Sequence, residues 1–203
     1  MLGRLTLVAA AATTIFFLGC SSDSGDGDGN DGAGGGAGVG GSGSGAGSNV
    51  EPPDQLGMTE AHNVVRASVS PPANPPLAPL VWSDGLVTIA KAHADKCIFE
   101  HSMGDTGENL YASVGSPAPT PQSVVDSWAS ETEFYDYASN DCTPGEQCGH
   151  YTQIVWRDTG AVGCAQVTCT GNSPFSGPFA DDPWVNWVCE YDPPGNWVGE
   201  KPY

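Results

Sequence analysis

Apolar residues recur at every third or fourth position in three segments of the chain, and this spacing predicts three helices. The segments are 58–69, 83–99 and 120–137. Thr59 is the expected cap of the first. The inward face of the second is predicted to carry Leu86, Ile89, Ala90, His93 and Cys97.

The third predicted helix begins at Thr120, which is a suitable cap, with Pro121 in the first turn. Its apolar stripe contains Val124, Trp128 and Tyr135, and Glu131 falls on the same stripe. A carboxylate on an apolar face is costly unless it is paired or hydrogen-bonded. Two readings stay open: either the helix is rotated and Glu131 faces water, or Glu131 lies in a polar cavity.

The last third of the chain has the alternation that is typical of strands. Strands are predicted at 150–156, 160–169 and 184–191, and a loop rich in Gly and Pro is predicted at 170–183. In the first strand, one side would carry His150, Thr152, Ile154 and Trp156. Helices followed by short strands indicate an α+β fold with an antiparallel sheet.

The N-terminal segment 1–19 reads as a signal peptide, because Arg4 is its only charge and an apolar run at 5–18 is too short to span a bilayer stably. It ends in "FFLGC", which resembles the bacterial lipoprotein cleavage box. That resemblance implies cleavage before Cys20 and lipidation of Cys20. An ordinary signal peptide cut nearby is the alternative.

Residues 20–55 form an expected linker, since 21–48 consist mostly of Gly, Ser, Ala and Asp and cannot build a core. The folded domain is expected at 56–203. The whole layout predicts an extracytoplasmic protein that is held at a membrane by its N-terminal lipid, or alternatively a secreted one.

The formal net charge of −18 excludes nucleic acid as a partner, because neutralising phosphates requires Lys and Arg. The same charge would repel anionic headgroups, so membrane contact is expected only through the lipid. We expect a monomer.

Six cysteines remain besides Cys20, and an even number in an exported chain predicts three disulfides. Thiolate-bound structural zinc is disfavoured, because the chain contains no Cys-x-x-Cys pair. Spacing alone leaves all 15 pairings of six cysteines open.

Motifs spread over the whole domain resemble one family. "HNVVR", "PLVWSDGL", "CIFEHS", "GENLY", "WASETEFYDY", "CGHYTQIVWRDTGAVGCA" and "CEYDPPGNWVGEKPY" occur in order. The chain resembles the CAP superfamily (cysteine-rich secretory proteins, antigen 5 and pathogenesis-related class 1 proteins), and most of all its plant pathogenesis-related branch. The resemblance implies an α-β-α sandwich with a three-stranded antiparallel sheet between helical layers. It also implies the disulfides Cys97–Cys169, Cys142–Cys148 and Cys164–Cys189.

The resemblance further implies a cavity lined by two histidines and two acids, which are His101, Glu108, Glu131 and His150 here. Such a set could hold Zn²⁺ through His101 and His150, with Glu108 and Glu131 nearby. A zinc-dependent hydrolase is therefore one candidate function. No His-Glu-x-x-His or Gly-x-Ser-x-Gly motif supports it, and we lean against an enzyme.

Members of the family bind sterols and other small lipids, and the matching region here is the segment 137–148. Phe134, Tyr135 and Tyr137 are candidate lipid contacts, although all three could equally be core. The tail at 193–203 is expected to pack against the sheet through Trp197. The prediction is an extracytoplasmic, surface-anchored domain that binds a small lipid or sterol-like ligand or a protein partner. A purely structural or interaction module is the third alternative.

Overall fold

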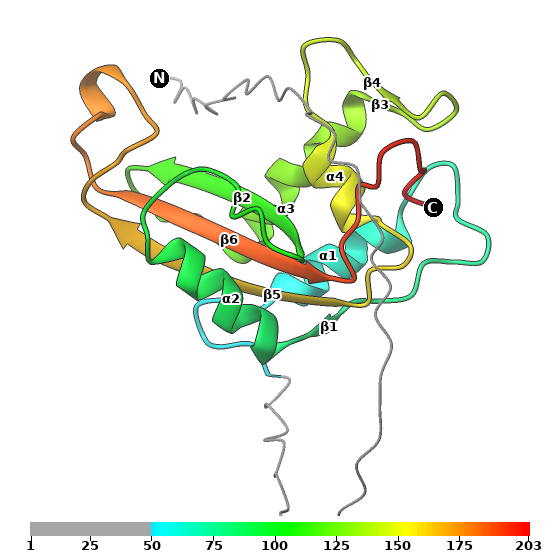
Figure 1. Ribbon diagram of the computed structural model, residues 1–203, viewed down its shortest axis with the longest axis horizontal. Coiled ribbons are helices and arrows are strands. Elements are labelled where there is room, and N and C mark those ends of the chain that lie inside the picture. The colour runs from blue at the N-terminus through cyan, green and yellow to red at the C-terminus, as the bar shows by residue number, and fades with distance from the viewer. Residues whose placement is uncertain (1–49) are drawn as a thin grey trace, which may run out of the picture. The chain divides into compact units, whose positions relative to one another are not determined.

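The computed structural model describes residues 50–203, and Figure 1 shows the arrangement of their helices and strands. The predicted signal peptide, the lipidation site Cys20 and the linker up to residue 49 lie outside the described residues. The helices are α1 Met58–Ala67, α2 Asp84–Ala94, α3 Pro121–Ala129 and α4 Gly149–Ile154. The strands are β1 Val81–Trp82, β2 Gly107–Val114, β3 Tyr135–Asp136, β4 Asp141–Cys142, β5 Ala161–Cys169 and β6 Trp184–Asp192. Two short 3₁₀ turns are Ser130–Glu133 and Gly177–Phe179.

The main sheet has four strands in the order β1-β5-β6-β2, and β3 pairs with β4 in a separate hairpin. The long strands β5, β6 and β2 are antiparallel, whereas β1 runs parallel to β5. The predicted three-stranded antiparallel sheet was therefore wrong by one strand. The extra strand, β1, has only two residues, which is too short for alternation to be recognised.

Helices cover both faces of the sheet, so the layers follow the α-β-α order that the resemblance implied (Figure 1). On one face α2 contributes Ala90 and Ala94, which pack on Leu110, Ala165 and Val188 of the sheet. The other face carries a larger core, in which residues of α1, α3 and α4 pack on β5 and β6; these include Ala61, Val124, Val125, Trp128, Ile154, Trp187 and Tyr191. Strand β6 is buried on both sides, because Trp187 and Val188 point to opposite faces.

The segment predicted as a strand at 150–156 is instead helix α4. The third long strand of the sheet is β2, which the apolar pattern did not predict. Six residues are too few to separate a period of 2 from one of 3.6, and Thr152, Ile154 and Val155 have strand propensity. Tyr151 and Ile154 of α4 are buried in the larger core. Tertiary packing therefore overrides the local preference.

Helix α2 ends at Ala94, five residues before the predicted end of the segment. Leu86, Ala90 and His93 are buried as expected. Ile89 was expected on the same inward face, but it is 44% exposed. Cys97 lies beyond the helix, with a φ of 51°.

Helix caps are partly as expected. Thr120 caps α3 with Pro121 in the first turn. Thr59 is not the cap of α1, because the carboxylate of Glu51 accepts from the amides of Gly57 and Thr59. Helix α3 ends at Ala129, which leaves Glu131 in the following 3₁₀ turn.

The structure contains the disulfides Cys97–Cys169, Cys142–Cys148 and Cys164–Cys189, which are the pairs implied by the resemblance. Cys164 and Cys189 lie directly opposite each other on β5 and β6. Cys148 precedes α4, so its bond to Cys142 ties that helix to the β3–β4 hairpin. Within residues 50–203 no helix is long and apolar enough to cross a membrane.

Candidate functional site

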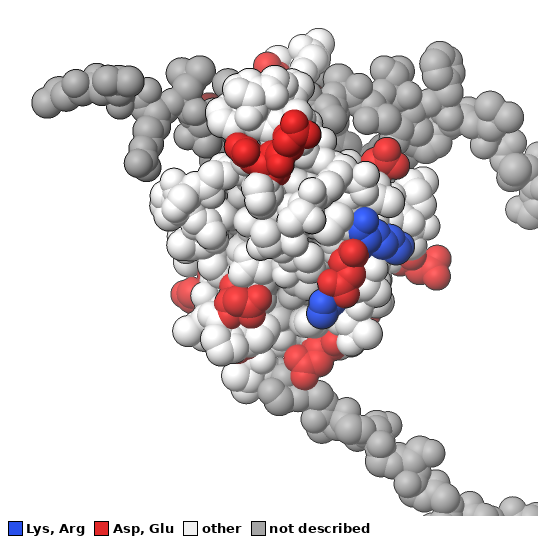
Figure 2. Space-filling view, turned by 90° about the vertical axis from the view of Figure 1, so that its left-hand side faces the viewer, with Lys and Arg blue, Asp and Glu red and all other residues white. Residues whose placement is uncertain are grey.

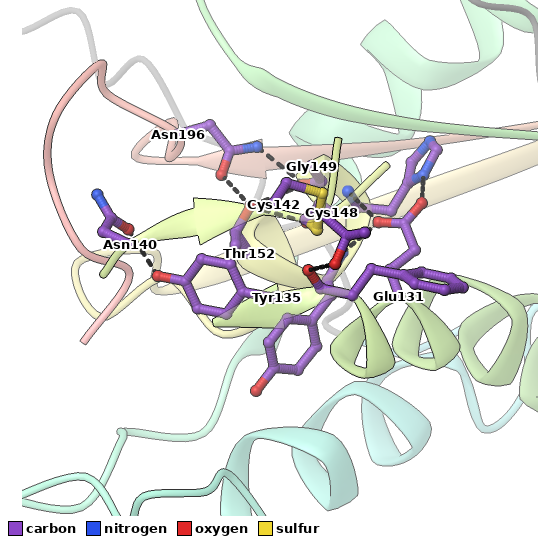
Figure 3. Close-up of a disulfide and its surroundings, with 12 residues drawn as sticks. Glu131, Tyr135, Asn140, Cys142, Cys148, Gly149, Thr152 and Asn196 are labelled. Atoms are coloured by element: carbon purple, nitrogen blue, oxygen red, sulfur yellow. Dashed lines mark hydrogen bonds and ion pairs between the residues drawn. A yellow bond between two sulfur atoms is a disulfide. The ribbon is translucent and has the colours of Figure 1, made fainter. Parts of the chain in front are cut away.

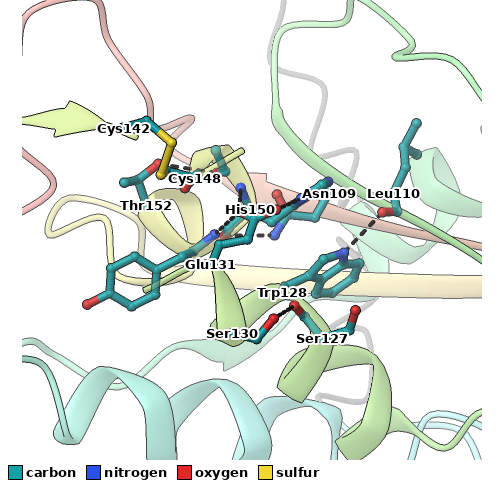
Figure 4. A network of polar contacts seen from close by, with 12 residues as sticks. Asn109, Leu110, Ser127, Trp128, Ser130, Glu131, Cys142, Cys148, His150 and Thr152 are labelled. Atoms are coloured by element: carbon teal, nitrogen blue, oxygen red, sulfur yellow. Dashed lines mark hydrogen bonds and ion pairs between the residues drawn. A yellow bond between two sulfur atoms is a disulfide. The ribbon is translucent and has the colours of Figure 1, made fainter. Parts of the chain in front are cut away.

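Glu131 binds the start of helix α4 (Figure 4). Its carboxylate accepts hydrogen bonds from His150 Nδ1 at 2.5 Å and from the backbone amides of His150 and Tyr151 at 2.9 and 3.1 Å. These amides belong to the first turn of α4, and Cys148 at the N-cap position supplies no side-chain cap. Glu131 therefore caps α4 from another element and satisfies amides that the helix itself cannot. The side chain of Glu131 is 13% exposed and hydrogen-bonded, which contradicts the reading in which it faces water.

The His150 ring is held on two further sides. It stacks on Trp128 at 6.0 Å between ring centroids, with 19° between the ring planes. The Asn109 side chain donates to the His150 carbonyl oxygen at 3.1 Å. Because Nδ1 donates to Glu131, the ring orientation and tautomer are fixed, and Nε2 is left without a partner among the described residues.

The second pair joins His101 to Glu108. His101 lies in the loop between α2 and β2, and its Nδ1 donates to Glu108 at 2.8 Å. The backbone amide of Ser102 donates to the same oxygen at 2.9 Å. The side chain of His101 is 55% exposed, whereas that of Glu108 is 5% exposed. The hydrogen bond to Glu108 raises the pKa of His101 above its ordinary value. Burial would raise the pKa of Glu108, but the hydrogen bonds from His101 and Ser102 outweigh it and lower that pKa.

Sequence reasoning missed a third carboxyl group, that of Glu190. Strand register places Glu190 directly opposite Glu108, and Glu190 is fully buried. The hydroxyl of Thr106 donates to Glu190 Oε2 at 2.5 Å, and His93 Nε2 lies 3.7 Å from Glu108 Oε2. Burial and, to a smaller extent, the neighbouring Glu108 carboxylate raise the pKa of Glu190 to about 7, although the Thr106 hydrogen bond lowers it. The available signal was Asn186 and Glu190 recurring with even spacing in an otherwise apolar strand.

The two histidines and two acids expected to line one cavity, which we call the tetrad, form two pairs: His101 with Glu108 and His150 with Glu131. No hydrogen bond or ion pair within residues 50–203 joins His101 or Glu108 to Glu131 or His150, and this part of the chain has no group of three His, Cys, Asp or Glu residues placed to hold a metal ion. Both pairs attach to consecutive residues of β2, since Glu108 holds His101 and Asn109 holds the His150 carbonyl.

The donor set nevertheless has one feature that suits a cation. Each histidine donates Nδ1–H to a carboxylate, which is the arrangement that orients a metal-binding imidazole and leaves Nε2 to act as the ligand. In such a site Glu108 and Glu131 would orient the imidazoles, because Glu108 Oε1 and both oxygens of Glu131 already accept imidazole or backbone hydrogen bonds.

In the described part of the chain, no hydroxyl or thiol group hydrogen-bonds to His101 or His150. The Ser102 hydroxyl accepts from the Gly104 amide, and the Thr106 hydroxyl donates to Glu190. All six cysteines of this region are in disulfides. The geometry thus does not assemble a nucleophile and base.

A surface pocket of about 340 Å³ lies beside the Cys142–Cys148 disulfide. Figure 3 shows the surroundings of this disulfide. It is bounded by three segments: the β3–β4 region, helix α4 and the C-terminal tail. Its lining includes Tyr135, Asn140, Glu146, Thr152, Trp156, Asn196, Trp197 and Glu200, and none of the tetrad residues. Asn196 forms hydrogen bonds with Thr152 and Gly149, which join the tail to α4. Tyr135 donates to Asn140, which joins β3 to the residue that precedes β4 within the pocket lining.

The candidate lipid contacts fall around this pocket, but they are engaged elsewhere. Tyr135 lines it and also packs against the larger core. Tyr137 stacks on Tyr203 at 4.5 Å and donates its hydroxyl to the Tyr203 carbonyl oxygen. Phe134 is half-buried and does not line the pocket. The expectation that the tail packs against the sheet through Trp197 was wrong, because Trp197 is 58% exposed and lines the pocket.

The surface charge agrees with the composition. The face in Figure 2 carries several separated groups of acidic side chains and few basic ones. Of the five basic residues in the described part, Arg66 is buried, where its guanidinium donates to the carbonyl oxygens of Ala78, Ile154, Trp156 and Thr159.

Comparison with known proteins identifies the family. Residues 59–191 match the cysteine-rich secretory protein (CAP) family. "Pathogenesis-related protein PR-1" of Medicago truncatula is 42% identical over 145 residues, which is 70% of this chain and 74% of that protein. "Peptidase inhibitor 16" of Mus musculus is 40% identical over 149 residues, which is 72% of this chain but only 28% of that longer protein.

Among solved structures, venom allergen-like protein 4 of Schistosoma mansoni aligns with a TM-score of 0.56 and 25% identity, over 75% of this chain and 95% of that one. The zinc-containing structure of NaASP2 aligns with a TM-score of 0.56 over 74% of this chain and 84% of that one, and at 21% identity it supports the fold alone. Secretory relatives agree with an extracytoplasmic location. This chain belongs to the cysteine-rich secretory protein (CAP) family.

Proposed function

We propose that the protein is an extracytoplasmic binding module, attached to a membrane through lipid at Cys20, and that its ligand site is the pocket beside the Cys142–Cys148 disulfide. The observation that carries this proposal is the pocket itself. It combines aromatic side chains with polar ones, and its walls are held by a disulfide and by hydrogen bonds between three segments. Preformed hollows of this mixed character are the usual small-molecule sites.

The ligand class that the proposal covers is a small lipid or sterol-like molecule, or a projecting group of a protein partner. Tyr135, Trp156 and Trp197 supply the apolar part of the lining. A protein partner agrees with relatives whose names describe action on other proteins, such as "Peptidase inhibitor 16". In this proposal the Glu131–His150 pair stabilises the pocket, because Glu131 caps α4, which provides Gly149 and Thr152 to the lining.

The test is a titration of the purified protein with two uncharged fluorescent lipids, a sterol and a long-chain monoacylglycerol. Saturable binding that is lost in Trp197→Ala, and retained in the control His101→Ala, whose residue does not line the pocket, supports the pocket. Binding that survives Trp197→Ala contradicts it.

The two histidines favour a second candidate function, divalent-cation binding through the Nε2 atoms of His101 and His150. When bound, a cation such as Zn²⁺ would supply Lewis-acid chemistry and a charge that attracts an anionic ligand. The ligands must be neutral imidazoles, so binding weakens as the pH falls. The raised pKa of His101 moves that loss to higher pH than an ordinary histidine would show. Stoichiometric zinc in the purified protein that disappears in His101→Ala and in His150→Ala supports this candidate. Zinc that survives both substitutions contradicts it.

The anchor has its own test. Cys20→Ser is expected to release the protein from membranes into the soluble fraction, and continued membrane association would contradict lipidation.

A further inference from the structure

We propose that the pocket beside the Cys142–Cys148 disulfide recognises an organic ammonium group of its ligand. This inference rests on the proposed function, in which that pocket is the ligand site. It adds the chemical class of the group that is bound there.

The charges of the lining have a single sign. Glu146 and Glu200 are the charged residues that line the pocket, and no Lys, Arg or His does. Neither carboxylate forms an ion pair with a residue in the described part of the chain. The residues that line the pocket therefore carry a net negative charge, and the complementary charge of a ligand is positive.

An exposed indole lies in the same lining. Trp197 is 58% exposed, whereas the other five tryptophans of the chain are between 0 and 4% exposed. The face of an indole attracts a cation more strongly than that of any other side chain. Tyr135 and Trp156 add two further aromatic groups to the lining.

The remaining polar groups are already used, which disfavours other ligand classes (Figure 3). The Asn196 amide accepts from Thr152 and donates to the Gly149 carbonyl. The Asn140 amide accepts from Tyr135 and donates to the Glu200 carbonyl. The pocket thus has few free side-chain donors for an anion or for the hydroxyl groups of a sugar. The pocket retains carboxylate acceptors and aromatic faces. These suit an ammonium group, which donates hydrogen bonds and accepts none.

The protein holds one of its own ammonium groups against an aromatic ring, with carbonyl oxygens as the acceptors. Lys201 places its Nζ 4.6 Å from the centroid of the Tyr137 ring and donates to the carbonyl oxygens of Tyr137 and Ala138. The tail and the β3–β4 hairpin are therefore joined by an aromatic and acceptor-rich ammonium site within the molecule itself.

The experiment uses the full protein and choline chloride as the probe. Its matched control is 3,3-dimethylbutan-1-ol, a neutral molecule of the same shape. Because Trp197 is the exposed tryptophan, the readout is protection of tryptophan fluorescence from acrylamide quenching, with the Kd measured by calorimetry. We expect choline to protect Trp197 with a Kd in the millimolar range or below, and to bind at least about 10-fold more tightly than the neutral alcohol.

Variants identify the groups responsible. Glu146→Gln and Glu200→Gln are each expected to weaken choline binding by about 3- to 10-fold, and added salt is expected to weaken binding to the native protein. Glu60→Gln, on an exposed position of α1 outside the pocket, is the control and is expected to leave the Kd unchanged. A second arm uses Nα-acetyl-lysine methylamide. Tighter binding of this probe than of choline assigns the ammonium to a partner protein, and tighter binding of choline assigns it to a small molecule or lipid headgroup.

The results that would overturn this inference differ from the result that would also overturn the proposed function. Equal protection by choline and the neutral alcohol, or no effect of both glutamine variants, refutes the ammonium site while the pocket stands as a ligand site. If the fluorescent lipids also bind independently of Trp197 and no probe protects it, the proposed function fails as well.

Discussion

Replacing Glu190 by Gln is expected to stabilise the protein, although Glu190 is fully buried and hydrogen-bonded. Glu190 faces Glu108 across β6 and β2, and one oxygen of each carboxyl group, Glu190 Oε1 and Glu108 Oε2, is buried without another hydrogen-bond partner. A glutamine at 190 can donate its amide to Glu108 and still accept from Thr106. It keeps the contacts and removes the charge.

The magnitude follows from the pKa of Glu190, which burial raises from 4.5 to about 7. Between these values the folded protein binds a proton that the unfolded chain has released. The contribution of Glu190 to the free energy of unfolding therefore falls as the pH rises from 4.5 to 7, and its full destabilising effect is present above pH 7. The difference in pKa corresponds to an upper limit of about 3 kcal/mol. Gln does not ionise, so the variant escapes this cost at high pH and gains nothing at low pH.

The assay is urea unfolding with the disulfides intact, followed by tryptophan fluorescence at pH 4.5 and pH 8. We expect Glu190→Gln to match the native protein at pH 4.5 and to exceed it by up to about 3 kcal/mol at pH 8. The control Glu60→Gln, on the exposed face of α1, should show no such pH dependence. An identical difference at both pH values, or a variant that is less stable at pH 8, would refute the reasoning.

Three further substitutions test the packing around the site. Gly163→Ala should cost about 3 kcal/mol in urea unfolding, because its Cβ would lie 2.5 Å from backbone atoms of the start of α2, whereas Gly160→Ala meets no atom within 4 Å and should be close to neutral; equal costs would contradict this. Tyr191→Phe should cost about 2 kcal/mol in thermal unfolding, because the hydroxyl donates to His62 and accepts from the side-chain amide of Asn109. An unchanged melting temperature would be inconsistent with that role. Glu131→Ala should accelerate hydrogen exchange at the Tyr151 amide by about 10-fold, because alanine has no oxygen that can accept from the amides of α4; unchanged exchange would show that Glu131 is not the cap of α4.

The features that could be predicted from the sequence are those set by neighbouring residues. The cap at Thr120 with Pro121, and the buried face of α2 at Leu86 and Ala90, follow from local rules. The long strands β5 and β6 followed from their alternation and β-branched content.

The remaining features depend on contacts between residues far apart in the chain. Helix α4 is stabilised by Glu131 and by the bond from Cys148 to Cys142, and neither contribution is visible in its own six residues. Strand β2 pairs along its whole length with β6, which lies some 80 residues further on.

The candidate site shows the same division. Motif resemblance placed His101, Glu108, Glu131 and His150, but it did not separate them into two pairs. That separation depends on which imidazole nitrogen donates to which carboxylate. Glu190 was missed because its importance comes from strand register, which places it opposite Glu108.

Strand β2 is at the outer position of the sheet, and two of its consecutive residues work in different layers of the sandwich. Glu108 meets the α2 side, where His93 and Glu190 lie, and Asn109 meets the opposite side at Tyr191. A slip of one residue against β6 would push a carboxylate into the larger apolar core and remove the partner of His101. The polar residues of β2 thus make a shifted register with β6 less stable than the native one, in addition to holding the site.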